Sequence, residues 1–123
     1  MWSFFLLGRF FDLRNINSLK NTPQFKKVYV EGKSVANRQL VLYVLRNDGT
    51  DVRLGISAGR KLGGSVERHR VMRLVRESFV ALRDQIPEGC DLVVIPRIPA
   101  VFCSQQEIQS SMHHLVKLSG LMR

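Results

Sequence analysis

Apolar residues recur with helical spacing in three segments of the chain. The first lies between Thr22, the expected N-cap, and Gly32, an expected stop, with Pro23 at its first helical position. The second follows Ser65, another expected N-cap, and aligns one face made of Val71, Leu74, Val75, Ser78, Phe79 and Leu82. We therefore expect amphipathic helices in both places, each with one side in a core.

The third segment runs from Ser104 through Leu118, and Ser104 and Glu107 have the spacing of a capping box. Its expected inner side consists of Ile108, Met112, Leu115 and Val116. Before it, residues 91–95 are a short run rich in apolar residues, which predicts a buried strand that stops at Pro96. A strand and a helix therefore complete the C-terminal part.

Two further β-prone stretches, residues 36–45 and 52–57, flank the turn signal Asn47-Asp48-Gly49, which predicts a hairpin between them. In the second stretch, apolar residues alternate with Arg53, Gly55 and Ser57. One face of that strand is therefore apolar, and the other offers a cation, bare backbone and a hydroxyl. The expected order is α-β-β-α-β-α, with a first β region that can split in two, in an α+β domain.

Composition is ordinary for a globular domain, but charge is not. The chain has 123 residues, 45% hydrophobic and 24% charged, which predicts a single folded domain. Residues 53–83 hold eight Lys and Arg residues against Glu67 and Glu77, and so carry +6 of the formal net charge of +9. Such a density repels itself unless a polyanion lies against it. The charge indicates nucleic acid first and an anionic membrane surface second.

Residues 1–17 begin with the apolar run MWSFFLLGRFF. Arg9 interrupts this run and no small-residue cleavage site follows it, so a signal peptide is disfavoured. The run is also too short to span a bilayer. We expect an apolar N-terminal arm without chemistry, followed by one domain over residues 18–123.

The sequence offers no local catalytic or metal-binding motif. Gly59 and Gly64 have the spacing of a phosphate-binding loop, but Ser65-Val66 stands where such a loop requires Lys followed by Ser or Thr. His113 and His114 are adjacent and so point to different helix faces. We predict a polypeptide that is itself non-catalytic and holds no metal.

The two cysteines, Cys90 and Cys103, lie thirteen positions apart with no CxxC motif. Two free, buried thiols in a reducing cytoplasm are the favoured interpretation. A disulfide and half of a metal site are the less favoured alternatives.

The segment RLGISAGRKLGGSVERHRVMRLVRE resembles the signature of the bacterial ribonuclease P protein subunit. In that family an Arg-x-Gly-x-Ser strand leads through a Lys-x-Gly loop into a helix bearing Arg-Asn-Arg. The resemblance extends through FKKVYVEGKSVANRQLVLYV upstream and DLVVIPR downstream, and covers roughly residues 18–118. This sequence has His69 where the family usually has Asn, Met72 where Lys is usual and Ser65 where Ala is usual.

The resemblance implies a compact two-layer α/β sandwich, similar to the second domain of ribosomal protein S5, with a left-handed βαβ crossover. It also implies a cytoplasmic protein that binds a catalytic RNA, with 1:1 stoichiometry and without a membrane. The holoenzyme of such a protein removes the 5′ leader of precursor tRNA. The Mg²⁺ ions belong to the RNA-based active site, and the protein alone binds no cofactor.

Charge and resemblance together predict two surfaces. The surface for the catalytic RNA would consist of Arg53, Ser57, Arg60, Lys61, Arg68, His69, Arg70, Arg73 and Arg76. The resemblance also implies a cleft for the leader, with bases stacking on aromatic rings, made of Phe25, Lys26, Tyr29, Asn37, Arg38 and Tyr43. Without the resemblance, three such aromatic residues indicate core more readily than a cleft.

Two rival classes stay open. A structural RNA-binding protein, such as a ribosomal protein, would use the same basic helix without needing the aromatic cleft. An amphipathic protein of the membrane surface would explain both the charge and the apolar arm. The second is disfavoured because the apolar face of the basic helix is flanked by two strands that need covering.

Overall fold

The computed structural model describes residues 18–19 and 21–121. The predicted apolar arm, residues 1–17, lies outside the described residues. In chain order the elements are α2 (Thr22–Glu31), β1 (Lys33–Ala36), β2 (Leu40–Arg46), β3 (Val52–Ile56), the 3-10 helix η1 (Arg60–Leu62), α3 (Ser65–Leu82), the 3-10 helix η2 (Arg83–Gln85), β4 (Cys90–Pro96), the 3-10 helix η3 (Ile98–Phe102) and α4 (Gln105–Leu118).

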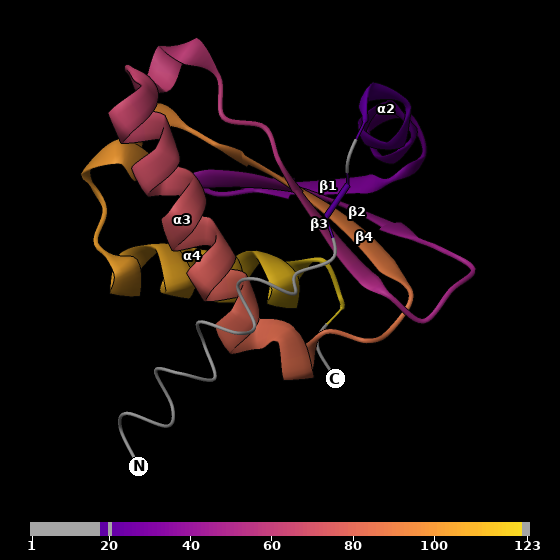
Figure 1. Cartoon of the computed structure of the whole chain (residues 1–123). Helices are drawn as coiled ribbons and strands as arrows, with labels where there is room; N and C mark the ends of the chain where they lie inside the picture. The colour runs from indigo at the N-terminus through magenta and orange to yellow at the C-terminus, as the bar shows by residue number, and fades with distance from the viewer. Residues whose placement is uncertain (1–17, 20, 122–123) are drawn as a thin grey trace.

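The four strands form one mixed sheet in the order β1-β2-β4-β3 (Figure 1). The neighbouring pairs β1–β2 and β2–β4 are antiparallel, whereas β3 and β4 run parallel. The helix α3 connects β3 to β4, so these elements make a βαβ unit between adjacent parallel strands. The α+β order and the splitting of the first β region are thereby confirmed. The left hand of the crossover and the likeness to ribosomal protein S5 stay predictions.

The predicted hairpin between the second and third strands is wrong. The turn itself forms, since the Gly49 N–H donates a hydrogen bond to Asn47 Oδ1 at 2.9 Å. However, β4 lies between the two strands that the turn joins. The reason is that β4 is buried on both faces, with six of its seven residues in the buried class, and so belongs in the middle of the sheet. The hairpin that does form joins β1 to β2.

The main core lies between one face of the sheet and the pair α3 and α4, which is the predicted two-layer arrangement. All six residues expected on the inner face of α3 are buried, and Phe79 is fully enclosed. On α4 the four predicted inner residues are buried as well. Prediction and structure agree here because both helices are long, and several turns with the same spacing of apolar residues define one buried face.

The helix α2 covers part of the opposite sheet face (Figure 1). Val28 at its centre is buried with Leu19 and with Val93 of β4, and these three form a second, smaller core. The central strand β4 therefore contributes side chains to both cores. Among the helices that the structure describes, none is long and apolar enough to cross a membrane.

The first residues of α2, α3 and α4 test the N-caps that were predicted from the sequence. The capping box of α4 is confirmed, because the Glu107 N–H donates to Ser104 Oγ at 3.2 Å and the Ser104 N–H donates to Glu107 Oε1 at 3.0 Å. The N-cap of α2 is Asn21 instead of the predicted Thr22, and the Asn21 side chain accepts a hydrogen bond from the Gln24 N–H at 3.1 Å. The N-cap of α3 is Gly64, and the predicted cap Ser65 is its first helical residue.

Candidate nucleic-acid interface

The basic side of α3 lies opposite its buried face. His69 and Arg73 are exposed, and Arg68 and Arg76 are half-buried. Arg60 and Lys61 in η1 are exposed just before the helix. Within residues 18–19 and 21–121, no carboxylate forms an ion pair with these cations. The structure thus brings together most of the predicted RNA-binding residues along one continuous segment.

Arg70, another residue predicted to bind RNA, also has a structural role. Its guanidinium donates to two backbone carbonyl oxygens, Val101 O at 3.1 Å and Cys103 O at 2.9 Å. These bonds attach η3 and the residue after it to α3. Arg70 is nevertheless exposed, so N–H groups on its fork stay open to a phosphate.

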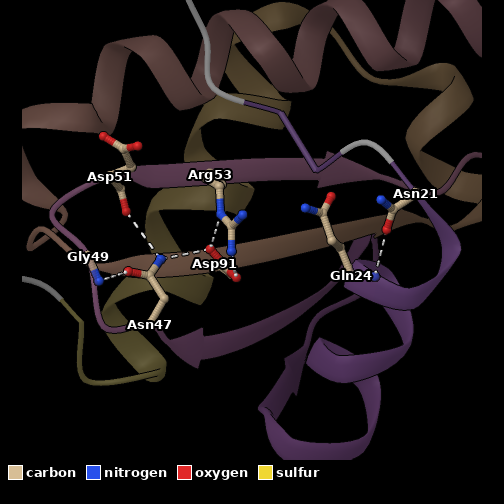
Figure 2. A network of polar contacts seen from close by, with 7 residues as sticks. All are labelled: Asn21, Gln24, Asn47, Gly49, Asp51, Arg53 and Asp91. Atoms are coloured by element: carbon tan, nitrogen blue, oxygen red, sulfur yellow. Dashed lines mark hydrogen bonds and ion pairs between the residues drawn. The ribbon is translucent and has the colours of Figure 1, made fainter.

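Arg53 was predicted to adjoin the same surface, but the structure places it in an ion pair. Its Nε donates to Asp91 Oδ1 at 2.8 Å and its Nη2 to Asp91 Oδ2 at 2.7 Å, as Figure 2 shows. Asn47 Nδ2 also donates to Asp91 Oδ1, at 2.8 Å. The hydrogen bond to Asp91 raises the pKa of Arg53. The neighbours of Arg53 on β3, Val52 and Leu54, point into the main core. Since side chains alternate along a strand, Arg53 lies on the opposite face of the sheet, which α2 partly covers.

Ser57, also predicted to adjoin this surface, is half-buried just beyond the end of β3. Its backbone N–H donates to Val94 O at 3.0 Å, which extends the pairing of β3 with β4 by one step. The chain then turns toward η1. Ser57 is therefore near the start of the basic segment in sequence, whereas its backbone belongs to the sheet.

The three predicted cleft aromatics are in contact as a row from α2 to β2. The ring centroids of Phe25 and Tyr29 are 6.4 Å apart, and those of Tyr29 and Tyr43 are 5.0 Å apart in an edge-to-face arrangement at 76°. All three side chains are half-buried, and they pack against the smaller core. At Gly55, a Cβ would come within 2.7 Å of Phe25 Cζ, so the glycine permits the close approach of this ring.

A small groove joins the aromatic row to the basic helix at the edge strand β3. Its volume is about 170 Å³, and its lining includes Phe25 from α2, Gly55 from β3, and Met72 and Arg76 from α3. The two predicted surfaces therefore meet, although α2 and α3 cover opposite faces of the sheet. Met72 contributes an uncharged wall to this groove.

A larger hollow of about 670 Å³ lies where the β4 end meets η1. Its floor is mostly apolar, and Arg60, Lys61 and Arg97 are part of its lining. The sequence analysis missed Arg97 as a candidate. The signal was its position next to Pro96, the proline that ends the buried strand 91–95.

Of the polar residues predicted at the cleft rim, Lys26 and Arg38 are exposed, but Asn37 is engaged elsewhere. Asn37 Oδ1 accepts hydrogen bonds from the backbone N–H groups of Gln39 at 3.1 Å and Leu40 at 2.9 Å. Its Nδ2 donates to Ser111 O on α4 at 3.1 Å. The side chain of Asn37 thus fixes the β1–β2 turn against α4, and the structure does not bring it together with the aromatic row.

Cysteine and histidine form no metal site in the part of the chain that the structure describes, where no group of three or more His, Cys, Asp and Glu side chains could hold an ion. His113 and His114 are both exposed. Cys90 and Cys103 are free and buried, which confirms that part of the favoured interpretation, while the reducing cytoplasm stays a prediction. Burial raises the pKa of both thiols.

Comparison with known proteins identifies the family. Residues 13–119 match the family model described as Ribonuclease P. A "Ribonuclease P protein component" of Lachnoclostridium phytofermentans is 48% identical over 106 residues, which is 85% of this chain and 90% of the relative.

Solved structures agree. The RNase P protein of Staphylococcus aureus matches with a TM-score of 0.80 at 35% identity, covering 89% of this chain and 100% of that one. A mutant of the Staphylococcus aureus protein, described as having defective mRNA degradation activity, matches with a TM-score of 0.79 at 36% identity, covering 85% of this chain and 89% of that one. The resemblance predicted from residues 53–77 is confirmed, and the chain belongs to the ribonuclease P protein family as a protein component of that enzyme.

Proposed function

We propose that this chain binds the catalytic RNA of ribonuclease P and the 5′ leader of precursor tRNA, and so assists Mg²⁺-dependent endonucleolytic removal of the leader. One copy of the chain acts with one RNA in the cytoplasm, and the product is the mature tRNA 5′ end. The observation that carries the proposal is the basic segment from Arg60 to Arg76, whose cations lie in η1 and off the buried face of α3 and form no ion pair with a carboxylate among the described residues.

The catalytic RNA contacts the basic side of α3. An arginine fork can bridge two phosphate oxygens, and several such contacts fix the helix on an RNA backbone without reading its sequence. Each neutralised phosphate also releases counterions, which makes binding strongly salt-dependent. This part of the proposal needs the side chains of Arg68, Arg73 and Arg76 to be accessible to RNA, and none of the three belongs to the buried face of α3.

The leader follows the aromatic row on the other side of the sheet. Single-stranded bases stack on aromatic rings with little regard to sequence, which suits a protein that meets many different leaders. The half-buried rings of Phe25, Tyr29 and Tyr43 expose part of their surface while their inner sides pack. The groove that links Phe25 to Arg76 lets a strand on this side reach the basic surface.

The bond is broken in the RNA subunit, where Mg²⁺ supplies an activated water and stabilises the leaving oxygen. The contribution of the protein is affinity and placement. Holding the leader on one surface and the catalytic RNA on the other brings the scissile phosphate to the RNA active site. The cations of α3 also offset repulsion between RNA phosphates, which lowers the Mg²⁺ concentration that the RNA needs.

The mutant of the Staphylococcus aureus relative makes cleavage of mRNA by the protein a second candidate activity. For this chain we favour RNA-dependent cleavage. His69, the histidine of the basic segment, is exposed among arginines, whereas a general base must be held within hydrogen-bond reach of the proton that it abstracts.

The decisive experiment adds the purified chain to a bacterial ribonuclease P RNA at a low Mg²⁺ concentration, where the RNA alone is slow. We expect cleavage of precursor tRNA at the mature 5′ end, and tighter binding of precursor than of mature tRNA. Tight binding of the RNA without any gain in cleavage would instead indicate a structural RNA-binding protein.

A further inference from the structure

Phe102, the last residue of η3, is exposed on the surface of the protein. Its exposed fraction is 83%, the highest among the exposed large hydrophobic side chains of the described residues. A single exposed apolar residue needs no explanation. Here, however, two more members of that group lie on the same or an adjoining element: Ile98 begins η3, and Val66 lies one turn before Arg70 on α3.

The backbone around Phe102 is held firmly. Arg70 donates to the carbonyl oxygens on both sides of it, Val101 O at 3.1 Å and Cys103 O at 2.9 Å. The Cys103 N–H donates to Ala100 O at 3.2 Å. The turn is therefore already ordered in the free protein. A ligand that packs on the ring would have to immobilise only the Phe102 side chain, so the entropic cost of binding is small.

The surroundings of Phe102 are basic. Arg70 is bonded directly to its neighbours. Burial raises the pKa of the adjacent Cys103, Glu107 adds to that rise, and the charges of Arg38 and Arg70 oppose it. Arg70 is therefore the cation that hydrogen bonds attach to this turn, and Glu107 is already bonded to the Ser104 N–H in the capping box.

An exposed aromatic ring beside an arginine is typical of a surface that binds unpaired nucleotides, because the ring stacks on a base while the guanidinium meets a phosphate. We propose that Phe102 stacks on an unpaired base of the catalytic RNA subunit. This inference rests on the proposed function and extends it by a contact outside both predicted surfaces.

The position of η3 favours the catalytic RNA over the leader. Arg70 attaches η3 to α3, whose basic side is the proposed surface for that RNA. In Figure 1, the orange segment that contains η3 lies beside the N-terminal half of α3, while α2 lies at the other side of the view. One RNA can therefore meet α3 and Phe102 together.

The test measures the affinity of the full chain for a bacterial ribonuclease P RNA, without tRNA, for Phe102→Ala, Phe102→Leu and Phe102→Tyr. We expect alanine and leucine to weaken binding by about fivefold to a hundredfold, as for the loss of one stacked base, and tyrosine to retain it. The slope of log affinity against log salt concentration should not change, since no ionic contact is lost. Val30→Ala, at a site that is 72% exposed on α2, is the matched control and should bind normally.

Several outcomes would overturn the inference. Wild-type affinity of Phe102→Ala would show that the ring meets no base, and full affinity of Phe102→Leu would indicate apolar contact without stacking. A loss seen only with precursor tRNA present would assign the ring to the leader, and a changed sedimentation of the free protein would assign it to a second copy. Failure of the wild-type chain to bind the RNA at all would instead contradict the proposed function.

Discussion

Arg53 and Asp91 form a two-pronged ion pair across the parallel strands β3 and β4, where they are direct partners in the strand register. The Asp91 side chain is 6% exposed and that of Arg53 is 33% exposed. The carboxylate is therefore buried, whereas the arginine side chain is partly open to solvent. Asn47 completes the arrangement from the turn after β2 (Figure 2). The Asp91 carboxylate thus joins the neighbouring strands β3 and β4 to the turn that follows β2.

Replacing Arg53 with Ala should destabilise the fold more than it weakens RNA binding. The substitution leaves a buried carboxylate with Asn47 as its remaining side-chain partner, and we expect a loss of about 2–3 kcal/mol in the free energy of unfolding, since one side of the pair is open to water. Denaturant titration measures this loss. The double variant Arg53→Ala with Asp91→Asn should recover part of it, because no buried charge is then left unpaired.

RNA binding by the folded Arg53→Ala variant distinguishes this structural role from the predicted contact. If Arg53 only holds Asp91, the salt dependence of binding to the catalytic RNA should equal that of the wild type. A slope smaller by about 0.7–0.9 would show that Arg53 reaches a phosphate after all.

Helical periodicity was the most reliable guide to this fold. The inner face of α3 was predicted residue by residue, because a helix of this length repeats its pattern over several turns. The cap of α2 was wrong by one residue, since Asn21 and Thr22 are both residue types that cap helices and the sequence does not say which side chain reaches the Gln24 N–H.

Contacts between segments that are distant along the chain could not be predicted from the sequence. The signal at Asn47-Asp48-Gly49 specified a turn, but it carried no information that β4 would pair with both flanking strands. Asn37 was predicted at the leader cleft, yet its side-chain amide donates a hydrogen bond to Ser111 O, 74 positions away. The same limit concealed the ion pair of Arg53, whose partner lies 38 positions along the chain.

The basic side of α3 is tested by replacing Arg68 and Arg73 with Ala. Both side chains lie off the buried face of the helix, so we expect a normal melting temperature. Binding to the catalytic RNA should weaken, and each lost phosphate contact should reduce the slope of log affinity against log salt concentration by about 0.7–0.9. Affinity measured between low and moderate salt gives this slope. An unchanged slope would mean that both side chains face solvent in the complex.

We also predict that the chain has no cleavage activity without the RNA subunit. The purified chain alone should cleave neither precursor tRNA nor an mRNA fragment at any Mg²⁺ concentration, whereas the RNA alone should cleave precursor tRNA slowly when Mg²⁺ is high. The measurement is product formation on a gel after nuclease treatment of the protein. Robust cleavage that persists through further purification, and that His69→Ala abolishes, would place a catalytic group in this chain.

Tyr43 provides the sharpest test of the leader surface. Its ring meets Tyr29 edge to face, and it is half-buried on β2. If the open side of the ring stacks on a leader base, Tyr43→Ala should weaken binding to precursor tRNA by roughly 1–3 kcal/mol, or about fivefold to a hundredfold. Binding to mature tRNA, which has no leader, should barely change.

The competing interpretation is that Tyr43 only fills the smaller core. Truncation would then lower the melting temperature and weaken binding to both tRNAs in proportion. Tyr43→Phe is the matched variant, because it keeps the ring and its contact with Tyr29 while removing the hydroxyl. Under the stacking hypothesis it should bind precursor tRNA nearly as the wild type does. Equal weakening toward precursor and mature tRNA by Tyr43→Ala would remove this residue from the leader surface, and would leave Phe25, beside the groove to Arg76, as the ring to test next.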